Sequence, residues 1–166
     1  LKKAVESELL GDALPGARLS DVTPKDLDNL DAPLTLAMKI EISSFAATRA
    51  GGLRLSPPFA PHLSRLISFP SRQTPLFIPE QLATSHRIEL RIKLPRGARC
   101  TLPPATKSEA PNLTYAIEDR LEGDVLILDR RIQLPSGRVQ PADYEAFAKS
   151  IRALDQAFER EILIDL

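Results

Sequence analysis

Tryptophan is missing from the 166-residue sequence, and cysteine and methionine occur once each. The single cysteine, Cys100, excludes an internal disulfide and a zinc site built from several cysteines. The 22 basic and 22 acidic residues cancel, so the chain lacks the positive charge that nucleic-acid or anionic-membrane binding usually requires. No apolar run approaches the roughly 18 residues of a membrane-spanning helix, and the first residues contain neither an initiator methionine nor a signal peptide. We therefore expect a piece of a longer protein, with no nucleic-acid partner and no membrane span.

Glycine is also scarce, with seven residues against fifteen prolines. Proline fixes φ and lacks an N–H donor, so this balance favours extended segments and stiff turns over long helices. With 43% hydrophobic and 27% charged residues, the composition is that of an ordinary globular domain. We expect a mainly β fold, an antiparallel two-sheet sandwich of immunoglobulin-like or related type.

Alternation of apolar and polar residues predicts the main strands. Residues 34–42 and 85–94 each place aliphatic side chains on one face and polar or charged side chains on the other. Residues 113–117 and 125–134 flank a polar turn and predict an antiparallel hairpin, in which Arg130 and Arg131 lie where one face emerges into water. Shorter strands are expected at residues 17–23, 52–55, 69–72, 99–102 and 161–164.

One amphipathic helix is expected over residues 142–160. Its apolar stripe consists of Tyr144, Phe147, Ile151, Leu154 and Phe158, spaced by three and four residues as one face of a helix requires. We expect this stripe to pack on the sheet. Residues 1–14 are expected to be the end of a preceding helix or a linker, and residues 15–166 the sandwich domain with its helix.

Cysteine catalysis requires a thiolate, a histidine within hydrogen-bond reach and usually a third group that orients the histidine. Cys100 lies on a predicted short strand and not at a helix N-terminus, which would lower its pKa. His62 lies in a proline-rich connection, and His86 begins a strand, where we expect a partly buried structural residue. The pattern favours no catalytic residue. A minimal cysteine hydrolase stays an alternative, and it requires an exposed Cys100 beside one of the two histidines.

Metal and cofactor sites lack the clustered ligands that they need. Two isolated histidines without neighbouring carboxylates do not form a transition-metal site. The acidic cluster formed by Asp21, Asp26, Asp28 and Asp31 lacks the central glycine and the distal glutamate of an EF-hand loop, so a solvated turn or a helix cap is expected there. Gly51 and Gly52 are typical of a hairpin turn and not of a phosphate loop. We expect no metal, no cofactor and no small-molecule ligand.

Sugar-binding β-sandwiches generally use exposed aromatic platforms, and only six phenylalanines and two tyrosines are present. Four of these are in phase with core positions of the helix or of a strand. The core is also the expected place for the other four, Phe45, Phe59, Phe69 and Phe77. A carbohydrate or cell-wall binding module is the alternative function, and it predicts a groove lined by at least two solvent-facing aromatic residues.

Several short elements occur in a particular order. Residues 29–33, Asn-Leu-Asp-Ala-Pro, precede a long strand; Arg72 and Pro75 form an Arg-x-x-Pro element; and residues 94–97 form a Leu-Pro-x-Gly element. Residues 141–147 and 155–160 then form the closing helix. In combination, over most of residues 15–165, these elements resemble the C-terminal β-domain of bacterial transglutaminase-like proteins. Such proteins carry an N-terminal domain of unknown function and a transglutaminase-like core before this module.

The resemblance implies a non-catalytic accessory or interaction domain, because the catalytic residues of such proteins belong to the preceding core. No catalytic residue carries over, and Cys100 falls in no motif of the family. The implied partner is the neighbouring transglutaminase-like domain or an envelope protein, and the implied location is periplasmic or exported. We also expect Arg72 to pair with an acidic residue such as Asp155 and so to fix the proline-rich connection against the helix.

Overall fold

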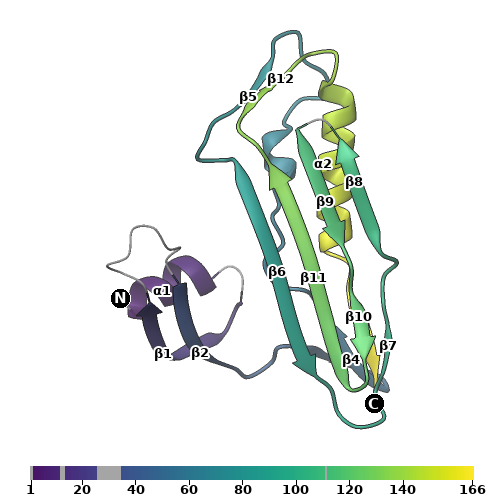
Figure 1. The fold of residues 1–166 in the computed structure, drawn as a ribbon. Coiled ribbons are helices and arrows are strands. Elements are labelled where there is room, and N and C mark those ends of the chain that lie inside the picture. The colour runs from purple at the N-terminus through teal and green to yellow at the C-terminus, as the bar shows by residue number, and fades with distance from the viewer. Residues whose placement is uncertain (1, 12–13, 26–34, 111) are drawn as a thin grey trace. The chain divides into compact units, whose positions relative to one another are not determined.

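The computed structural model describes residues 2–11, 14–25, 35–110 and 112–166 (Figure 1). The chain divides into two compact units, Leu1–Ala47 and Thr48–Leu166. The division lies after the second strand and not at residue 15, the boundary expected from the sequence. The reason is that the first two strands pair with each other along their whole length.

The first unit is a short helical segment packed on a two-stranded ribbon. α1 (Lys2–Val5) continues into a π-helical turn, η1 (Glu6–Leu10), and β1 (Ala17–Lys25) pairs antiparallel with β2 (Thr35–Ile42). Among the described residues of this unit, the buried side chains are those of Val5, Leu10 and Leu19. The strand expected over residues 34–42 is therefore confirmed for its described part.

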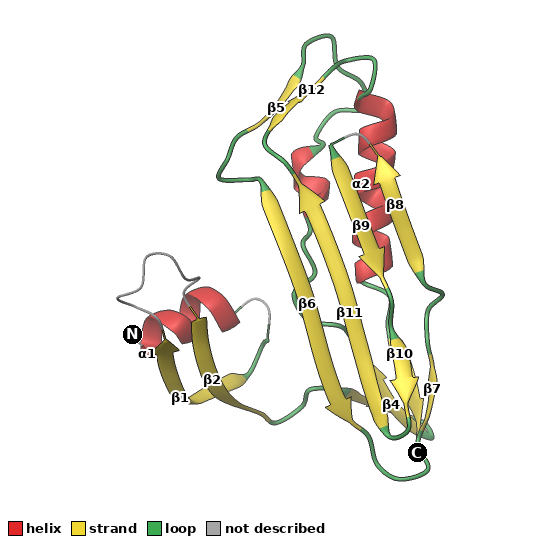
Figure 2. Cartoon of the chain, viewed as in Figure 1, coloured by secondary structure: helices red, strands yellow, loops and turns green. Residues whose placement is uncertain are grey.

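The second unit is built on a five-stranded antiparallel sheet, drawn in yellow in Figure 2. Its central strand, β11 (Val125–Leu134), pairs along one edge with β6 (Thr84–Lys93). Along its other edge, β9 (Leu113–Ile117) and β10 (Arg120–Glu122) follow one another in a single continuous register. β8 (Thr106–Ala110) pairs with β9. The predicted strand near residues 85–94 and the predicted hairpin are confirmed.

Two smaller sheets complete this unit. The first has the order β3-β4-β13-β7, with β3 (Ala47–Arg49), β4 (Gly52–Leu55), β13 (Ile162–Asp165) and β7 (Arg99–Thr101). The second is a ribbon in which β5 (Leu76–Ile78) pairs with β12 (Gly137–Val139). Gly51, with a φ of 76°, lies in the turn between β3 and β4, where a side chain would be strained.

The C-terminal helix, α2 (Tyr144–Phe158), covers one face of the five-stranded sheet. It contacts β8, β9 and the 3-10 helix η2 (Leu63–Leu66). Its five predicted stripe residues are all buried, and they share one core cluster with Tyr115 of β9 and with Ile132 and Leu134 of β11. The expected fold class is confirmed, since the chain is mainly β and antiparallel with one C-terminal helix, consistent with a β-sandwich.

The proline-rich connection differs from the prediction. Residues 69–72 form a bend followed by irregular chain and not the expected strand, because Pro70 has no N–H to donate to a neighbouring strand. The strand of this region is β5, a few residues later. β8 and β12 were also not expected from the sequence, and β8 brings a further row of side chains beside β9.

Candidate functional site

The three residues considered for cysteine catalysis lie on separate elements. Cys100 is half-buried on β7, opposite Ile164 of β13, whereas His62 precedes η2 and His86 lies exposed on β6. Burial, followed by the nearby carboxylate of Asp165, raises the pKa of the Cys100 thiol. The thiol is therefore a weaker nucleophile at neutral pH than a free cysteine. Within the part of the chain that the structure describes, no hydrogen bond or ion pair joins this thiol to an imidazole.

His62 lines a surface notch of about 400 Å³ together with Ser64, Asp155 and Glu159. Its Nδ1 atom lies 3.3 Å from Oε1 of Glu159, and its side chain is 68% exposed. Among the hydrogen bonds of the described residues, none joins the Ser64 hydroxyl to this imidazole. The notch therefore holds an oriented imidazole without an activated nucleophile.

Arg72 and Asp155 have separate partners, so the ion pair predicted between them is wrong. Both carboxylate oxygens of Asp155 accept backbone hydrogen bonds, from the N–H of Leu63 at 2.9 Å and from that of Ser64 at 2.7 Å. Asp155 thereby satisfies the first N–H groups of η2, which have no partner within that helix. The buried carboxylate attaches η2 to α2.

The Arg72 guanidinium instead lies over two aromatic rings, 5.7 Å from the ring centre of Tyr144 and 5.8 Å from that of Phe69. Its Nε donates a hydrogen bond to the carbonyl oxygen of Thr74 at 3.3 Å. The Tyr144 hydroxyl donates to the carbonyl oxygen of Phe69 at 2.8 Å. Arg72 does fix the connection against the start of the helix, but by stacking on aromatic rings.

Arg130 and Arg131 point to opposite faces of the sheet, because successive side chains of a strand alternate. The side chain of Arg131 is 52% exposed, as expected. Arg130 is only 1% exposed and contacts Asp119, whose side chain is fully buried. The expectation that both arginines emerge into water is wrong for Arg130. Arg130 is two residues from Ile132 and four from Leu134 on the same strand, so the alternation in the sequence could have placed its side chain on the inward face.

Three of the four phenylalanines expected in the core lie at the surface. The exposed fractions are 37% for Phe59, 59% for Phe69 and 63% for Phe77. Phe59 lines a groove of about 410 Å³ beside Leu82 and His86, whereas Phe69 and Phe77 line neither this groove nor the notch at His62. The short elements of the proline-rich connection leave these rings uncovered.

The acidic cluster can be assessed only at Asp21, which is exposed on β1. Asp26, Asp28 and Asp31 lie outside the described residues. Among the residues that are described, no group of three potential ligands could hold a metal ion.

No helix of the described residues is long and apolar enough to cross a bilayer.

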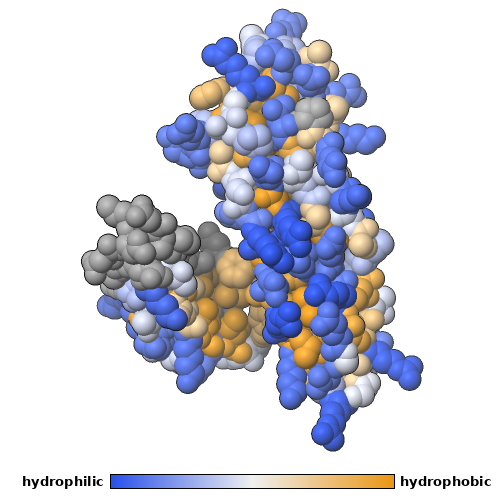
Figure 3. All heavy atoms as spheres, in the orientation of Figure 1, coloured by the Kyte–Doolittle hydropathy of each residue, from blue (hydrophilic) through white to orange (hydrophobic). Residues whose placement is uncertain are grey.

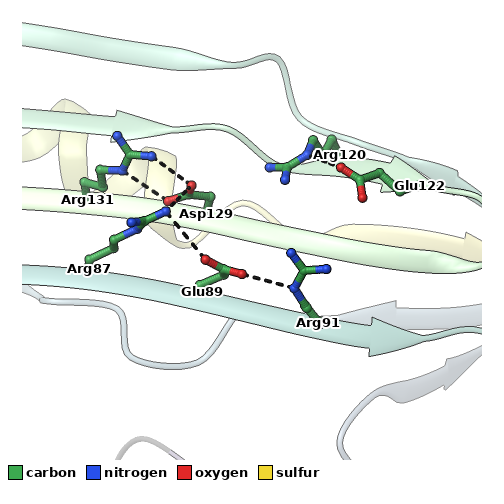
Figure 4. A network of polar contacts seen from close by, with 7 residues as sticks. All are labelled: Arg87, Glu89, Arg91, Arg120, Glu122, Asp129 and Arg131. Carbon is green, nitrogen blue, oxygen red and sulfur yellow. Dashed lines mark hydrogen bonds and ion pairs between the residues drawn. The ribbon is translucent and has the colours of Figure 1, made fainter.

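The face of the five-stranded sheet opposite α2, which we call the outer face, carries ordered rows of charge (Figure 4). The register places Arg87 of β6 opposite Arg131 of β11, Arg131 opposite Ala116 of β9, and Ala116 opposite Lys107 of β8. We call Arg87, Arg131 and Lys107 the basic row. Beside it, Glu89 of β6 lies opposite Asp129 of β11.

Asp129 connects the two arginines of the basic row. Its carboxylate accepts hydrogen bonds from Nη2 and Nε of Arg131 at 2.9 and 3.2 Å, and from Nη2 of Arg87 at 3.1 Å. The bond from Arg131 is the largest cause that holds the pKa of Asp129 below its usual value. Glu89 is likewise shared, between Arg87 and Arg91. Each of these two carboxylates therefore forms ion pairs with two guanidinium groups.

An open groove of about 480 Å³ borders the basic row. All three basic-row side chains line it, and so do four polar residues from the neighbouring register positions of the same four strands: Ser85, Gln133, Thr114 and Glu109. Ala116 lies between Arg131 and Lys107, and its small side chain leaves the surface hollow there. Hydrophilic residues cover much of this face in the space-filling view (Figure 3).

Some residues of the groove lie on strands that were predicted from the sequence, and others lie beside β8, a strand that was not predicted. Arg87 lies in the polar half of a predicted strand, and Arg131 lies in a predicted hairpin. Lys107 and Ala116 come together only through β8, whose small and polar inward residues give no alternating signal. At about 480 Å³ this groove is larger than the groove at Phe59 and the notch at His62, and we take it as the candidate site.

Comparison of the sequence with known proteins identifies the family of this chain. A family model described as a domain of unknown function with a solved structure, DUF3858, matches residues 53–164. The chain belongs to the DUF3858 family. The matched region begins in β4 and ends in β13, so it contains the five-stranded sheet, α2 and the groove. No curated protein matches the sequence.

The DUF3858 chain is also similar in structure to a protein from Parabacteroides distasonis that is described as a "putative protease". The two chains are 16% identical, with a TM-score of 0.50. The match covers 59% of this chain and 19% of that chain. The likeness shows a shared fold, and the matched part of the DUF3858 chain spans about a fifth of the length of that protein.

Proposed function

We propose that this DUF3858 chain is a non-catalytic interaction domain that contacts a neighbouring protein domain through its outer face. The observation that carries the proposal is the basic row beside an open groove, where arginines held by Asp129 face solvent. Charged and polar groups arranged in this way orient and select a protein partner. In the solved structure, a similar fold forms a fifth of a longer chain, which is the setting that such a domain requires.

The neighbouring domain that we propose is a transglutaminase-like core in a bacterial envelope protein, periplasmic or exported. The resemblance rests on short elements whose contacts in this chain are structural. Arg72 stacks on Tyr144, Gly97 takes a φ of 85° in the turn after β6, and Asp155 caps η2. Residues with these roles maintain a docking scaffold, and catalysis would belong to the neighbouring core.

The test uses the full-length protein that carries this chain, with and without residues 48–166. We expect removal of the unit to lower the thermal unfolding temperature of the remaining protein or its acyl-transfer activity on a glutamine-containing peptide. The matched comparison is the full-length protein with Lys107→Glu, which reverses one charge of the outer face and leaves both arginine partners of Asp129 in place. Unchanged stability and unchanged activity in both variants would contradict the proposal. Recovery of the protein only from the cytoplasmic fraction of the producing bacterium would contradict the proposed location.

A carbohydrate or cell-wall binding module is the second candidate, and the exposure of Phe69 and Phe77 favours it. Exposed aromatic rings are the platforms on which sugars stack. Against it, each of the three grooves described above is lined by at most one exposed aromatic residue. Pull-down on insoluble peptidoglycan and polysaccharides separates the two functions. Retention that is lost on Phe69→Ala and Phe77→Ala, but kept on Lys107→Glu, would favour the carbohydrate module.

A further inference from the structure

We infer that the outer-face groove binds an extended acidic segment of polypeptide, about four residues long, that lies across the strands beside the basic row. The inference rests on the proposed function, because it names the chemistry of the partner that the interaction domain would contact. It follows from the charge, the length and the hydrogen-bonding groups of the groove.

The charge of the groove is positive and only partly neutralised. Three cationic side chains, Arg87, Arg131 and Lys107, line it with one anionic side chain, Glu109. Asp129 lies beside the groove and is shared by both arginines, and Glu89 pairs with Arg87 and with a fourth cation, Arg91. Among the ion pairs of the described residues, none includes Lys107, which is exposed. Positive charge is therefore left over for an anionic ligand.

The two arginines are held in position before any ligand binds. Like charges directly opposite one another on antiparallel strands repel, and Arg87 and Arg131 are such a pair. Asp129 bridges them and fixes both guanidinium groups. Groups that are already ordered lose less side-chain entropy on binding, so a second carboxylate can bind to their remaining N–H donors at a low entropic cost.

The length of the groove suits a short stretch of extended chain. The basic row crosses β6, β11, β9 and β8, which are neighbours in that order. Three inter-strand spacings of roughly 4.8 Å give a span of about 14 Å. An extended residue spans about 3.4 Å, so about four residues fit along the row. The groove volume of about 480 Å³ lies within the range of ligand sites.

The second wall of the groove can satisfy the backbone of such a segment. The hydroxyls of Ser85 and Thr114 and the amide of Gln133 line the groove opposite the basic row. Hydroxyl and amide groups both donate and accept, so they can pair with the carbonyl and N–H groups of an extended peptide. Carboxylates on one edge of the peptide would face the basic row, and the polypeptide backbone would face this wall.

The probe is a peptide of four residues in all, in which glutamate and aspartate alternate. It carries a fluorescein label, has no free terminal charges, and is titrated with the 166-residue chain. Fluorescence anisotropy at low and at physiological salt measures its dissociation constant. We expect saturable binding that weakens as salt rises, because exposed charges are screened. The same peptide built from glutamine and asparagine should bind at least about tenfold more weakly, since it lacks the charges.

Two variants and a matched control locate the site. Lys107→Glu reverses the charge at one end of the basic row and should weaken binding by roughly fivefold or more. Ala116→Leu fills the hollow between Arg131 and Lys107 without changing charge and should also weaken binding. Lys149→Glu makes the same charge change on the exposed side of α2, in the layer on the other face of the sheet, and should change binding by less than about twofold.

Several results would overturn the inference. These are equal binding of the uncharged peptide, equal weakening by Lys149→Glu and Lys107→Glu, and displacement of the acidic peptide by inorganic phosphate at the same concentration of charge. Should Lys107→Glu unfold the chain, Lys107→Gln replaces it with the same expected direction. Absence of peptide binding, together with a clear effect of removing residues 48–166 from the full-length protein, would overturn the acidic partner and leave the interaction domain.

Discussion

Arg130 and Asp119 form a bidentate ion pair inside the core. Nε of Arg130 donates to Oδ1 of Asp119 at 3.2 Å, and Nη2 donates to Oδ2 at 2.5 Å. The two side chains are 1% and 0% exposed. Nη1 of Arg130 donates to the carbonyl oxygen of Phe158 at 2.8 Å, and the guanidinium lies 5.5 Å from the centre of the Phe158 ring. One arginine thus ties β11 to the last turn of α2.

Breaking this pair should be costly, because it leaves a buried charge without a partner. We expect Asp119→Ala to lower the free energy of unfolding by about 3–5 kcal/mol. The double change Asp119→Leu with Arg130→Met replaces both charges by apolar groups and should cost much less, since neither charge is then left unpaired. Urea unfolding of the three proteins measures both effects. A loss below about 1 kcal/mol for Asp119→Ala would contradict the buried pair.

The Asp129 bridge should make stability depend on pH in the acid range. The pKa of Asp129 is lower in the folded chain than its usual value, so its contribution is fully present above the unfolded pKa of about 4. The contribution is lost as pH falls through the folded pKa. We therefore expect Asp129→Asn to destabilise the chain at pH 7 and to have progressively less effect below about pH 4. Urea unfolding of both proteins from pH 7 to pH 2.5 measures this, and an equal difference at all pH values would contradict it.

Gly51 lies in the β3–β4 turn and Gly52 is the first residue of β4, and the two have different reasons to be glycine. A Cβ at Gly52 would clash with the backbone oxygen of Ile164, whereas at Gly51 it would meet open space with φ at +76°. We expect Gly52→Ala to separate β4 from β13 and to cost about 3 kcal/mol. Gly51→Ala should cost about 1 kcal/mol from the left-handed backbone alone. Thermal unfolding ranks the two, and equal losses would show that the close approach is not as tight as described.

Cys100 should react slowly with thiol reagents. Its pKa is raised, first by burial and then by Asp165, so the pH midpoint of its reaction should lie above that of a free cysteine. The rate of modification by Ellman's reagent on the folded chain, measured against pH, gives this midpoint. Asp165→Asn should move the midpoint down slightly, because it removes the smaller of the two causes. Fast reaction at neutral pH would instead favour the cysteine hydrolase alternative.

Long periodic segments were predictable because their burial follows directly from the side-chain pattern. The alternation around Ile88 and Leu90 and the helical spacing from Tyr144 to Phe158 each describe one inward face. The structure buries the helix stripe and leaves Ile88 and Leu90 half-buried. β8 was not predictable, because its inward residues Thr106 and Ser108 are not apolar. The chain contains a strand there because β9 offers it a partner edge.

The candidate site was less predictable than the fold. The alternation in β6 and β11 puts Arg87 and Arg131 on one face, but only the pairing register makes them neighbours. The aromatic partners of Arg72 were missed for a similar reason, since Phe69 and Tyr144 are 75 residues apart in the chain. Contacts between distant segments depend on tertiary packing, which a local pattern does not encode.

Lysine footprinting of the full-length protein tests the interaction domain most directly. Lys107 and Lys149 are both exposed in the described chain, the first on the outer face and the second on α2. Acetylation rates of each lysine are measured by mass spectrometry in the isolated 166-residue chain and in the full-length protein. We predict that Lys107 is modified several-fold more slowly in the full-length protein, while Lys149 is unchanged. Equal rates for Lys107 in both proteins would contradict docking at the outer face.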